Sequence, residues 1–187
     1  MMVKVAVIHH GNYGYTKTIA EYIALGAKEI AITVELYQSS EIEKNLSALD
    51  DANAIIFGSP TYFGSVSAEF KSFMDSTSQL WLKQKWKDKV AAAFTCANSP
   101  SGDQMSTLMQ LFIFASQHSM IWAGSDLMPK MQEYNEGLEV YNKLGSWVGF
   151  GLAVRGDQGE RIELEEVDIK AAKHFGKRIA KVAKKFK

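Results

Sequence analysis

The stretch Val3 to Ala20, VKVAVIHHGNYGYTKTIA, contains the pattern of a buried strand, a glycine-bearing turn and the start of a helix. Residues 3–8 form a nearly continuous apolar run, which is typical of a central strand covered on both faces. From Thr16 onward, apolar side chains such as Ile19 and Ile23 recur at helical spacing. The stretch therefore predicts a strand, a turn and a helix in direct succession.

The turn, Gly11 to Thr16 (GNYGYT), has the composition of an anion-binding loop. Gly11 and Gly14 allow a ligand to approach the backbone closely, and the helix that follows begins with N–H groups that lack intrahelical acceptors. The Thr16 hydroxyl is a further candidate ligand for a phosphate. The loop has neither the Gly-Lys-Ser/Thr of a Walker loop nor the G-x-G-x-x-G of a dinucleotide site. An ordinary strand-to-helix turn is the alternative interpretation.

The composition favours one globular domain, residues 1–187. Of the 187 residues, 47% are hydrophobic and 22% are charged, which is enough apolar material for one sizeable core. Lys and Arg together number 21, as do Asp and Glu, so the formal net charge is zero. A neutral chain gives no indication of binding nucleic acid or an anionic membrane surface. No apolar run reaches the ~20 residues of a membrane-spanning helix.

The single cysteine, Cys96, excludes an internal disulfide. Because no secretion signal precedes the first predicted strand, we expect a cytoplasmic protein. Cys96 has no base near it in the sequence, so we interpret it as a packing residue rather than a nucleophile. His9 and His10 are adjacent on a predicted strand and point to opposite faces, so we expect no metal site.

Apolar strands alternate with amphipathic helices along the rest of the chain. Strands are predicted at 33–37, 52–59, 90–95 and 120–123, and strand structure is expected to resume at 152–154. The β-α order, repeated about five times, predicts an α/β fold with a doubly wound parallel sheet. The glycine-bearing segment Gly124 to Gly151 matches no regular element, and we expect it near the functional site.

The predicted helices differ in how clearly their ends and faces can be assigned. Ser65 or Ser67 is expected to cap a helix that continues to about Ser78. A later helix, 163–186, has a clear apolar face. In the helix after Asp103, one face is shared by Met105, Leu108, Met109 and Phe112.

Three turns follow predicted strands, namely Gly11 to Thr16, Pro60 to Gly64 and Ala97 to Asp103. The carboxyl ends of parallel strands meet at one edge of a sheet, and ligands bind at that edge near the point where the strand order reverses. We therefore expect these three loops to build one pocket.

The sequence resembles the flavodoxin-like superfamily, and within it the tryptophan-repressor-binding-protein (WrbA) type of NAD(P)H:quinone oxidoreductases. The resemblance covers nearly the whole chain. It rests on GNYGYT at Gly11 to Thr16, GSPTYFGSVSAEFKSFMD at Gly58 to Asp75, NSPSGD at Asn98 to Asp103, QHSM at Gln117 to Met120 and NKLGSWVG at Asn142 to Gly149. The second motif is the most specific of these.

The resemblance implies a five-stranded sheet of order 2-1-3-4-5 with helices on both faces, and an FMN cofactor. The phosphate would be held by Gly11, Asn12, Tyr13, Gly14, Tyr15 and Thr16. Gly11 stands where the family commonly has a hydroxyl residue. The isoalloxazine would lie between Pro60, Thr61, Tyr62, Phe63 and Gly64 on one side and Ala97, Asn98, Ser99, Pro100, Ser101, Gly102 and Asp103 on the other. His118 matches the family's histidine beside the flavin and is the catalytic candidate.

Several of these residues have a second interpretation. Phe63 is either an aromatic wall of the pocket or a core residue. His118 is either a partner of the flavin or a helix-end histidine bonded to a carbonyl. Asp103 either contacts the flavin or stabilises the helix dipole. Trp81 either caps the pocket of a neighbouring subunit or anchors its own loop.

The resemblance implies an FMN-dependent enzyme that takes electrons from NAD(P)H and passes them to a quinone-like acceptor, as a homodimer or homotetramer. The main alternative is a flavodoxin-type electron carrier. Such carriers are typically strongly acidic, and the neutral charge of this chain favours the enzyme. A non-catalytic FMN-binding protein with a sensing or scaffold role is a third possibility.

Overall fold

The computed structural model describes residues 3–11, 14–100, 103–130, 140–154 and 164–187. Within these residues a parallel sheet has six strands, with the order β2-β1-β3-β4-β5 and with β6 also paired to β4. This order confirms the predicted flavodoxin-like order 2-1-3-4-5, whereas the predicted number of five strands is exceeded by one because two short strands pair with β4. The strands are β1 (Lys4–His9), β2 (Thr33–Gln38), β3 (Ala54–Pro60), β4 (Val90–Ala97), β5 (Ile121–Trp122) and β6 (Phe150–Ala153).

Two short strands share the outer side of β4. β5 pairs with Val90 and Ala91 at the start of β4, and β6 pairs with residues 94–97 at its end. Residues 124–130 and 140–149 between them form neither helix nor strand, as predicted, and residues 131–139 lie outside the described chain. Phe150 and Gly151 belong to β6, so the predicted irregular segment ends two residues earlier than expected.

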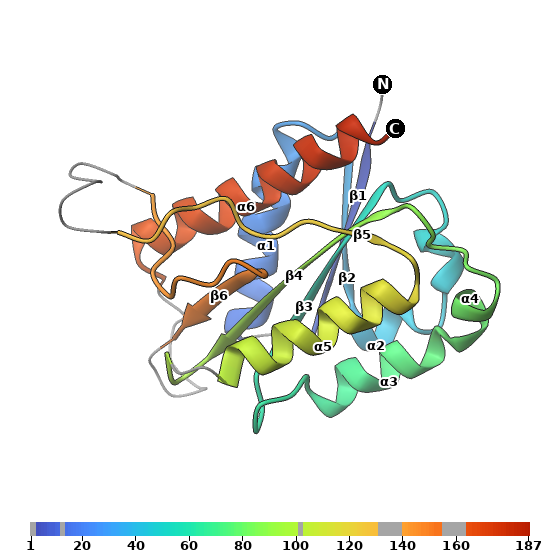
Figure 1. Ribbon diagram of the computed structural model, residues 1–187, viewed down its shortest axis with the longest axis horizontal. Coiled ribbons are helices and arrows are strands. Elements are labelled where there is room, and N and C mark those ends of the chain that lie inside the picture. Colours follow the sequence, from blue (N-terminus) through green and yellow to red (C-terminus); the bar gives the residue numbers. More distant parts are fainter. Residues whose placement is uncertain (1–2, 12–13, 101–102, 131–139, 155–163) are drawn as a thin grey trace.

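Helices cover both faces of the sheet, as predicted (Figure 1). The helices α1 (Tyr15–Lys28) and α6 (Glu166–Lys185) lie on one face. The other face is covered by α2 (Ser39–Ile42), the 3-10 helix η1 (Leu46–Leu49), α3 (Ala68–Ser76), α4 (Ser78–Leu82) and α5 (Asp103–Gln117). None of the described helices is long and apolar enough to span a membrane.

The face under α1 and α6 has an aliphatic core in which the two helices come into backbone contact. A Cβ atom on Gly26 would lie 1.8 Å from the carbonyl oxygen of Lys173. A Cβ atom on Gly176 would lie 1.9 Å from that of Ile23. Both distances are far below van der Waals contact, so the close approach of these helices requires glycine at both positions.

The opposite face has an aromatic core. The ring of Phe114 lies 5.4 Å from that of Phe57 and 6.2 Å from that of Trp86, centroid to centroid. Trp86 is completely buried. Trp86 lies in the polar connection between α4 and β4, where lysines flank it in the sequence but its own side chain turns inward.

Two details of the predicted helices are settled by the structure. Ser67 is the N-cap of α3, since its Oγ accepts a hydrogen bond from the Phe70 N–H at 3.1 Å. In α5 the buried face includes Leu108 and Leu111, whereas Met105 and Met109 are exposed. The face that Met105 shares with Met109 therefore points away from the core.

Candidate functional site

The carboxyl ends of β1, β3 and β4 lie side by side. His9 pairs with Gly58, and Pro60 pairs with Cys96 in the strand register. The pairing continues one step into the loops, because the Thr61 N–H donates to the Cys96 carbonyl at 2.9 Å. The three loops singled out in the sequence therefore leave the sheet at the same edge.

A pocket of about 480 Å³ opens between the second and third of these loops. Its lining residues are Thr61, Phe63, Gly64, Ala97, Asn98, Ser99 and Asp103. All seven are among the residues expected to contact an isoalloxazine. Pro60 is buried as the last residue of β3, Pro100 is exposed, and Ser101 and Gly102 lie outside the described residues.

The second loop makes a tight turn that exposes an aromatic ring. Tyr62 and Ser65 exchange two backbone hydrogen bonds of 2.9 and 3.0 Å. The two residues between them, Phe63 and Gly64, both have positive φ angles, 50° and 72°. This conformation is costly for a non-glycine residue and is typically retained at functional sites. The Phe63 side chain is fully exposed at the pocket, which excludes the alternative that it packs in the core.

Side chains from α5 hold this turn in place, and sequence reasoning missed them. Gln110 donates from Nε2 to the Gly64 carbonyl at 3.1 Å and accepts from the Ser65 hydroxyl at 2.9 Å. The Thr61 hydroxyl lies 2.8 Å from the Thr95 hydroxyl and donates to that of Thr107 at 2.9 Å. The turn is therefore fixed to both β4 and α5, which preorganises this wall of the pocket.

The third loop is fixed by Gln104, which is almost completely buried. Its Nε2 donates to the Ser99 carbonyl at 3.1 Å, and its Oε1 accepts from the Leu152 N–H at 3.1 Å. One side chain thus links the pocket to β6. A glutamine in the first turn of an amphipathic helix carries no sequence signal for this role, because its partners are distant in the chain.

The first loop ends at the N-terminus of α1. Gly14, the N-cap residue, has a φ of 94°, and a Cβ atom added to it would meet nothing within 4 Å. No described side chain caps this helix end, and its first turn contains no acidic residue. The helix start therefore presents backbone donors and an open approach, the features of an anion site. Asn12 and Tyr13 lie outside the described residues.

Among the described residues of this loop, Gly11 and Thr16 already have partners. The Thr16 side chain is buried and its hydroxyl lies 3.3 Å from the Cys96 Sγ. Burial raises the pKa of the Cys96 thiol to about 11, although the hydrogen bond with Thr16 opposes this shift, so the sulfur is a neutral packing group at neutral pH. The Gly11 N–H donates to the Glu69 carboxylate at 3.3 Å.

Within this chain His118 lies far from this pocket, whereas the prediction places it beside the flavin. Helix α5 starts at the pocket with Asp103 and runs antiparallel to the strands for 15 residues, or about 22 Å, before His118 follows it. His118 is buried, with Nε2 3.0 Å from the Thr77 hydroxyl and its ring 4.6 Å from that of Trp86. Burial lowers its pKa to about 4, so it is a neutral core residue at neutral pH.

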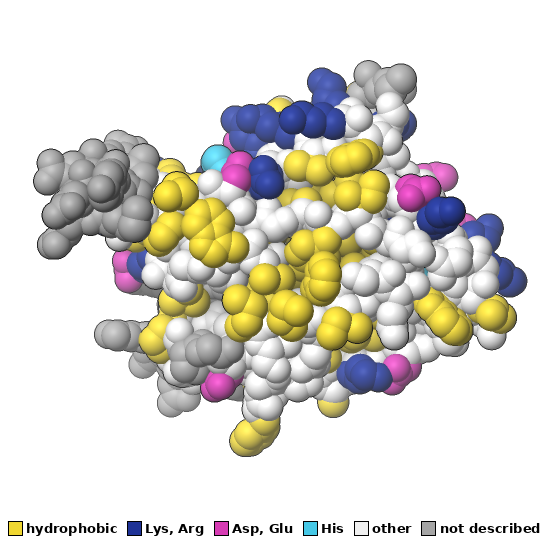
Figure 2. All heavy atoms as spheres, viewed as in Figure 1, with side chains coloured by type: hydrophobic (Ala, Val, Ile, Leu, Met, Phe, Trp, Pro, Cys, Tyr) yellow, Lys and Arg dark blue, Asp and Glu magenta, His cyan; other side chains and the backbone are white. Residues whose placement is uncertain are grey.

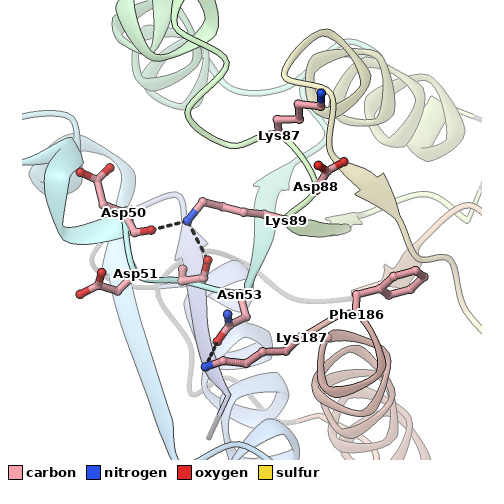
Figure 3. A pocket seen from close by; sticks show the side chains of 10 residues that line it. Asp50, Asp51, Asn53, Lys87, Asp88, Lys89, Phe186 and Lys187 are labelled. Carbon is pink, nitrogen blue, oxygen red and sulfur yellow. Dashed lines mark hydrogen bonds between the residues drawn. The ribbon is translucent and has the colours of Figure 1, made fainter. Parts of the chain in front are cut away.

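A second pocket, of about 280 Å³, lies at the amino edge of the sheet (Figure 3). The Lys89 ammonium donates hydrogen bonds there to the backbone carbonyls of Leu49, Asp50 and Ala52, at 3.1, 2.5 and 2.7 Å. Burial lowers its pKa, although Asp50 and Asp51 oppose this effect. Lys187 lies 3.4 Å from the Asn53 side-chain oxygen. Lys89 thus holds the protein's own backbone, and Lys187 contacts a side-chain amide.

Comparison with known proteins identifies relatives whose names agree with a flavodoxin-like redox protein. The family described as NADPH-dependent FMN reductase matches residues 18–130, which is more than half of the chain. "Flavodoxin FldP" of Pseudomonas aeruginosa is 35% identical, with 97% of each chain covered. An "NAD(P)H dehydrogenase (quinone)" of Archaeoglobus fulgidus is 32% identical, with 98% of this chain and 99% of that protein covered.

Solved structures give the same result. A "flavodoxin, WrbA-like protein" from Agrobacterium tumefaciens superposes with a TM-score of 0.75 at 31% identity, with 99% of both chains covered. An archaeal flavodoxin at 19% identity, with 97% of this chain and 99% of that chain covered, superposes with a TM-score of 0.66 and supports the fold alone. With the fold, the edge pocket and these relatives in agreement, the chain belongs to the NADPH-dependent FMN reductase family and is an FMN-dependent oxidoreductase of flavodoxin-like fold.

Proposed function

We propose that this protein transfers electrons from NAD(P)H to quinones or related acceptors, with FMN bound at the carboxyl edge of the sheet. The observation that carries the proposal is the pocket between Thr61 and Asp103, which has a fully exposed aromatic ring at its opening. Relatives named NAD(P)H dehydrogenase (quinone), at about 30% identity over nearly the whole chain, support the choice of acceptor.

The residues of the edge fit FMN. Gly14 leaves open space at a helix N-terminus that no described side chain caps, where a phosphate would meet the positive end of the helix dipole. The phosphate loop would comprise Gly11, Asn12, Tyr13, Gly14, Tyr15 and Thr16. The isoalloxazine would lie between the second and third loops. When bound, the flavin supplies the hydride-transfer chemistry that no side chain at this edge provides.

The protein's own residues position and shield that ring. Phe63 and Tyr62 provide apolar surface against which flat ring systems can stack. Gln110, Thr61 and Gln104 hold the two walls by hydrogen bonds, so the pocket needs little rearrangement on binding. His118 has no part in this chemistry, since its neutral ring is buried at the other end of α5.

The test is anaerobic mixing of the FMN-loaded protein with NADPH, followed by benzoquinone. Rapid loss of the oxidised flavin absorbance with NADPH, and its recovery with benzoquinone, is the expected result. Flavin that is bound but not reduced by NADPH would instead indicate an electron carrier. This alternative is supported by the 35% identity to a protein named flavodoxin.

A matched pair of variants ties this activity to the pocket. Phe63→Ala removes an exposed ring at the carboxyl edge, and Phe186→Ala removes an exposed ring at the amino edge. We expect Phe63→Ala to slow benzoquinone reduction severalfold and Phe186→Ala to leave the rate unchanged. Equal effects of the two substitutions would contradict the placement of the site.

A cytoplasmic location and a homodimer or homotetramer remain part of the proposal, and sedimentation of the purified protein tests the assembly.

A further inference from the structure

Glu69, in the first turn of α3, is the feature of the carboxyl edge that the function above does not use. Its Oε1 accepts hydrogen bonds from the Gly11 N–H at 3.3 Å and from the Ser39 hydroxyl at 2.5 Å. These partners come from the first loop and from the start of α2. A single carboxylate therefore joins three segments that are distant in the sequence.

The network around Glu69 extends to the second loop. The His10 Nδ1 lies 3.7 Å from the Glu69 Oε1 and 3.0 Å from the hydroxyl of Ser67, the N-cap of α3. The His10 ring also makes an edge contact with the ring of Tyr62, at 6.2 Å between centroids. The carboxylate that bonds the first residue of the phosphate loop is thus connected, through His10, to Tyr62 in the second loop.

Glu69 is an anion at neutral pH. Burial raises the pKa of its carboxyl group, but the hydrogen bonds from Ser39 and the Gly11 N–H and the proximity of His10 outweigh this effect, so the pKa is lowered overall. A negative charge is therefore bonded to the same loop that would hold the negatively charged phosphate of FMN.

We propose that Glu69 is a positioning residue that fixes Gly11 and also limits how tightly the loop binds the FMN phosphate. The Gly11 N–H is already taken by the carboxylate, and the carboxylate repels a phosphate dianion held by the same loop. The inference rests on the proposed position of FMN. Two effects of Glu69 on FMN affinity are therefore expected to oppose each other. Its hydrogen bond to Gly11 favours binding by fixing the loop, and its negative charge disfavours binding by repelling the phosphate.

Glu69→Gln separates the two effects. The amide oxygen can still accept from the Gly11 N–H and the Ser39 hydroxyl, while the charge is lost. A unit charge within several Å of a dianion near a protein surface corresponds to a change of about tenfold in affinity. We expect Glu69→Gln to bind FMN about tenfold more tightly than the unmodified protein, and to bind riboflavin, which has no phosphate, with unchanged affinity.

Glu43→Gln is the matched control. Glu43 also accepts a hydrogen bond from a serine hydroxyl, that of Ser72 at 3.1 Å, but this bond is exposed to solvent. The substitution removes the same charge from the same face of the molecule, and we expect it to leave FMN affinity within twofold. Glu69→Ala removes both the charge and the acceptor of the Gly11 N–H, and we expect it to bind FMN less tightly than Glu69→Gln.

The measurement is fluorescence titration of the flavin-free protein with FMN and with riboflavin, at low and at high salt. Because salt screens exposed charges, the advantage of Glu69→Gln should shrink as the salt concentration rises. The proposal is overturned if Glu69→Gln binds FMN no more tightly, or if riboflavin gains equally. Equal binding of FMN and riboflavin by the unmodified protein is a different result, which overturns the placement of the phosphate loop itself.

Discussion

At the carboxyl edge of the sheet, the side chains that hold the loop carbonyls, those of Gln104 and Gln110, do not line the pocket. At the amino edge, the side chain that holds the backbone is a lining residue, because Lys89 donates to the carbonyls of residues 49, 50 and 52. Both edges have a pocket, and only the one at the amino edge has a mainly polar lining (Figure 3). The comparison teaches that a charged lining residue is a weak sign of ligand binding when, like Lys89, it already bonds the protein's own backbone.

The largest expected effect comes from Gly14→Val at the carboxyl edge. The φ of 94° is unfavourable for valine, and its side chain would fill the space where a phosphate approaches the helix start. We expect FMN affinity to fall at least about a hundredfold, or about 2.7 kcal/mol. Titration of the flavin-free variant measures this, and urea unfolding checks that the variant still folds. An unchanged affinity would refute the assignment of the phosphate loop.

The second prediction concerns His118 at the other end of α5. Because burial lowers its pKa to about 4, the unfolded chain binds a proton that the folded protein does not bind between pH 6.5 and 4, and stability is lost as the pH falls through this range. His118→Gln should reduce the loss in free energy of unfolding between pH 7 and pH 4.5 by about 2 kcal/mol. Urea unfolding at the two pH values measures it. The variant should be reduced by NADPH at the rate of the unmodified protein, and a slower rate would reinstate His118 as a catalytic residue.

The third prediction, for Lys89→Met at the amino edge, is a loss of stability without a loss of FMN affinity. The substitution keeps most of the side-chain length but leaves the carbonyls of Leu49, Asp50 and Ala52 without their shared donor. Lys89 is only half-buried, so we expect a loss of about 1–2 kcal/mol in the free energy of unfolding. FMN affinity should stay the same. If FMN binding weakened instead, the two edges would not be functionally separate.

The smallest effect is expected for Gln110→Ala. Gln110 holds the turn at Gly64 and Ser65 but does not line the pocket. Its removal should therefore make the turn less rigid without deleting any side chain that would contact the ligand. We expect FMN affinity to fall about threefold to tenfold, or about 1 kcal/mol. Gln84→Ala, which removes a comparable exposed amide at the amino edge, is the control and should have no effect on FMN. A larger loss than that of Gly14→Val would show that the wall, and not the phosphate loop, dominates binding.

The strands, their order and the meeting of three loops could be predicted because they depend on patterns local to each segment. Apolar runs such as Ile55 to Phe57 indicate central strands, and parallel connectivity then brings their carboxyl ends together. The same logic located every described lining residue of the pocket. The loops could therefore be found from the sequence even though their conformations could not.

What the sequence did not show depends mainly on partners distant in the chain. His118 is an exception, because its expected position came from the family motif, although a helix of 15 residues that begins at Asp103 ends about 22 Å from the pocket. Gln104 and Gln110 are surface-type residues that become structural only because Ser99, Leu152 and Gly64 come within reach. Glu69 was part of the most specific motif, yet its bond to Gly11 spans 58 residues.

The backbone contact between α1 and α6 has a consequence for the order in which the protein can fold. Gly26 and Gly176 belong to helices separated by more than a hundred residues, and α1 covers its face of the sheet together with α6. During synthesis that face stays exposed to water until the ribosome has released α6, whereas the face under α3 and α5 is complete much earlier. The aromatic half of the core is thus the natural starting point for folding. The aliphatic half, with the helix that starts at the phosphate loop, completes the fold last.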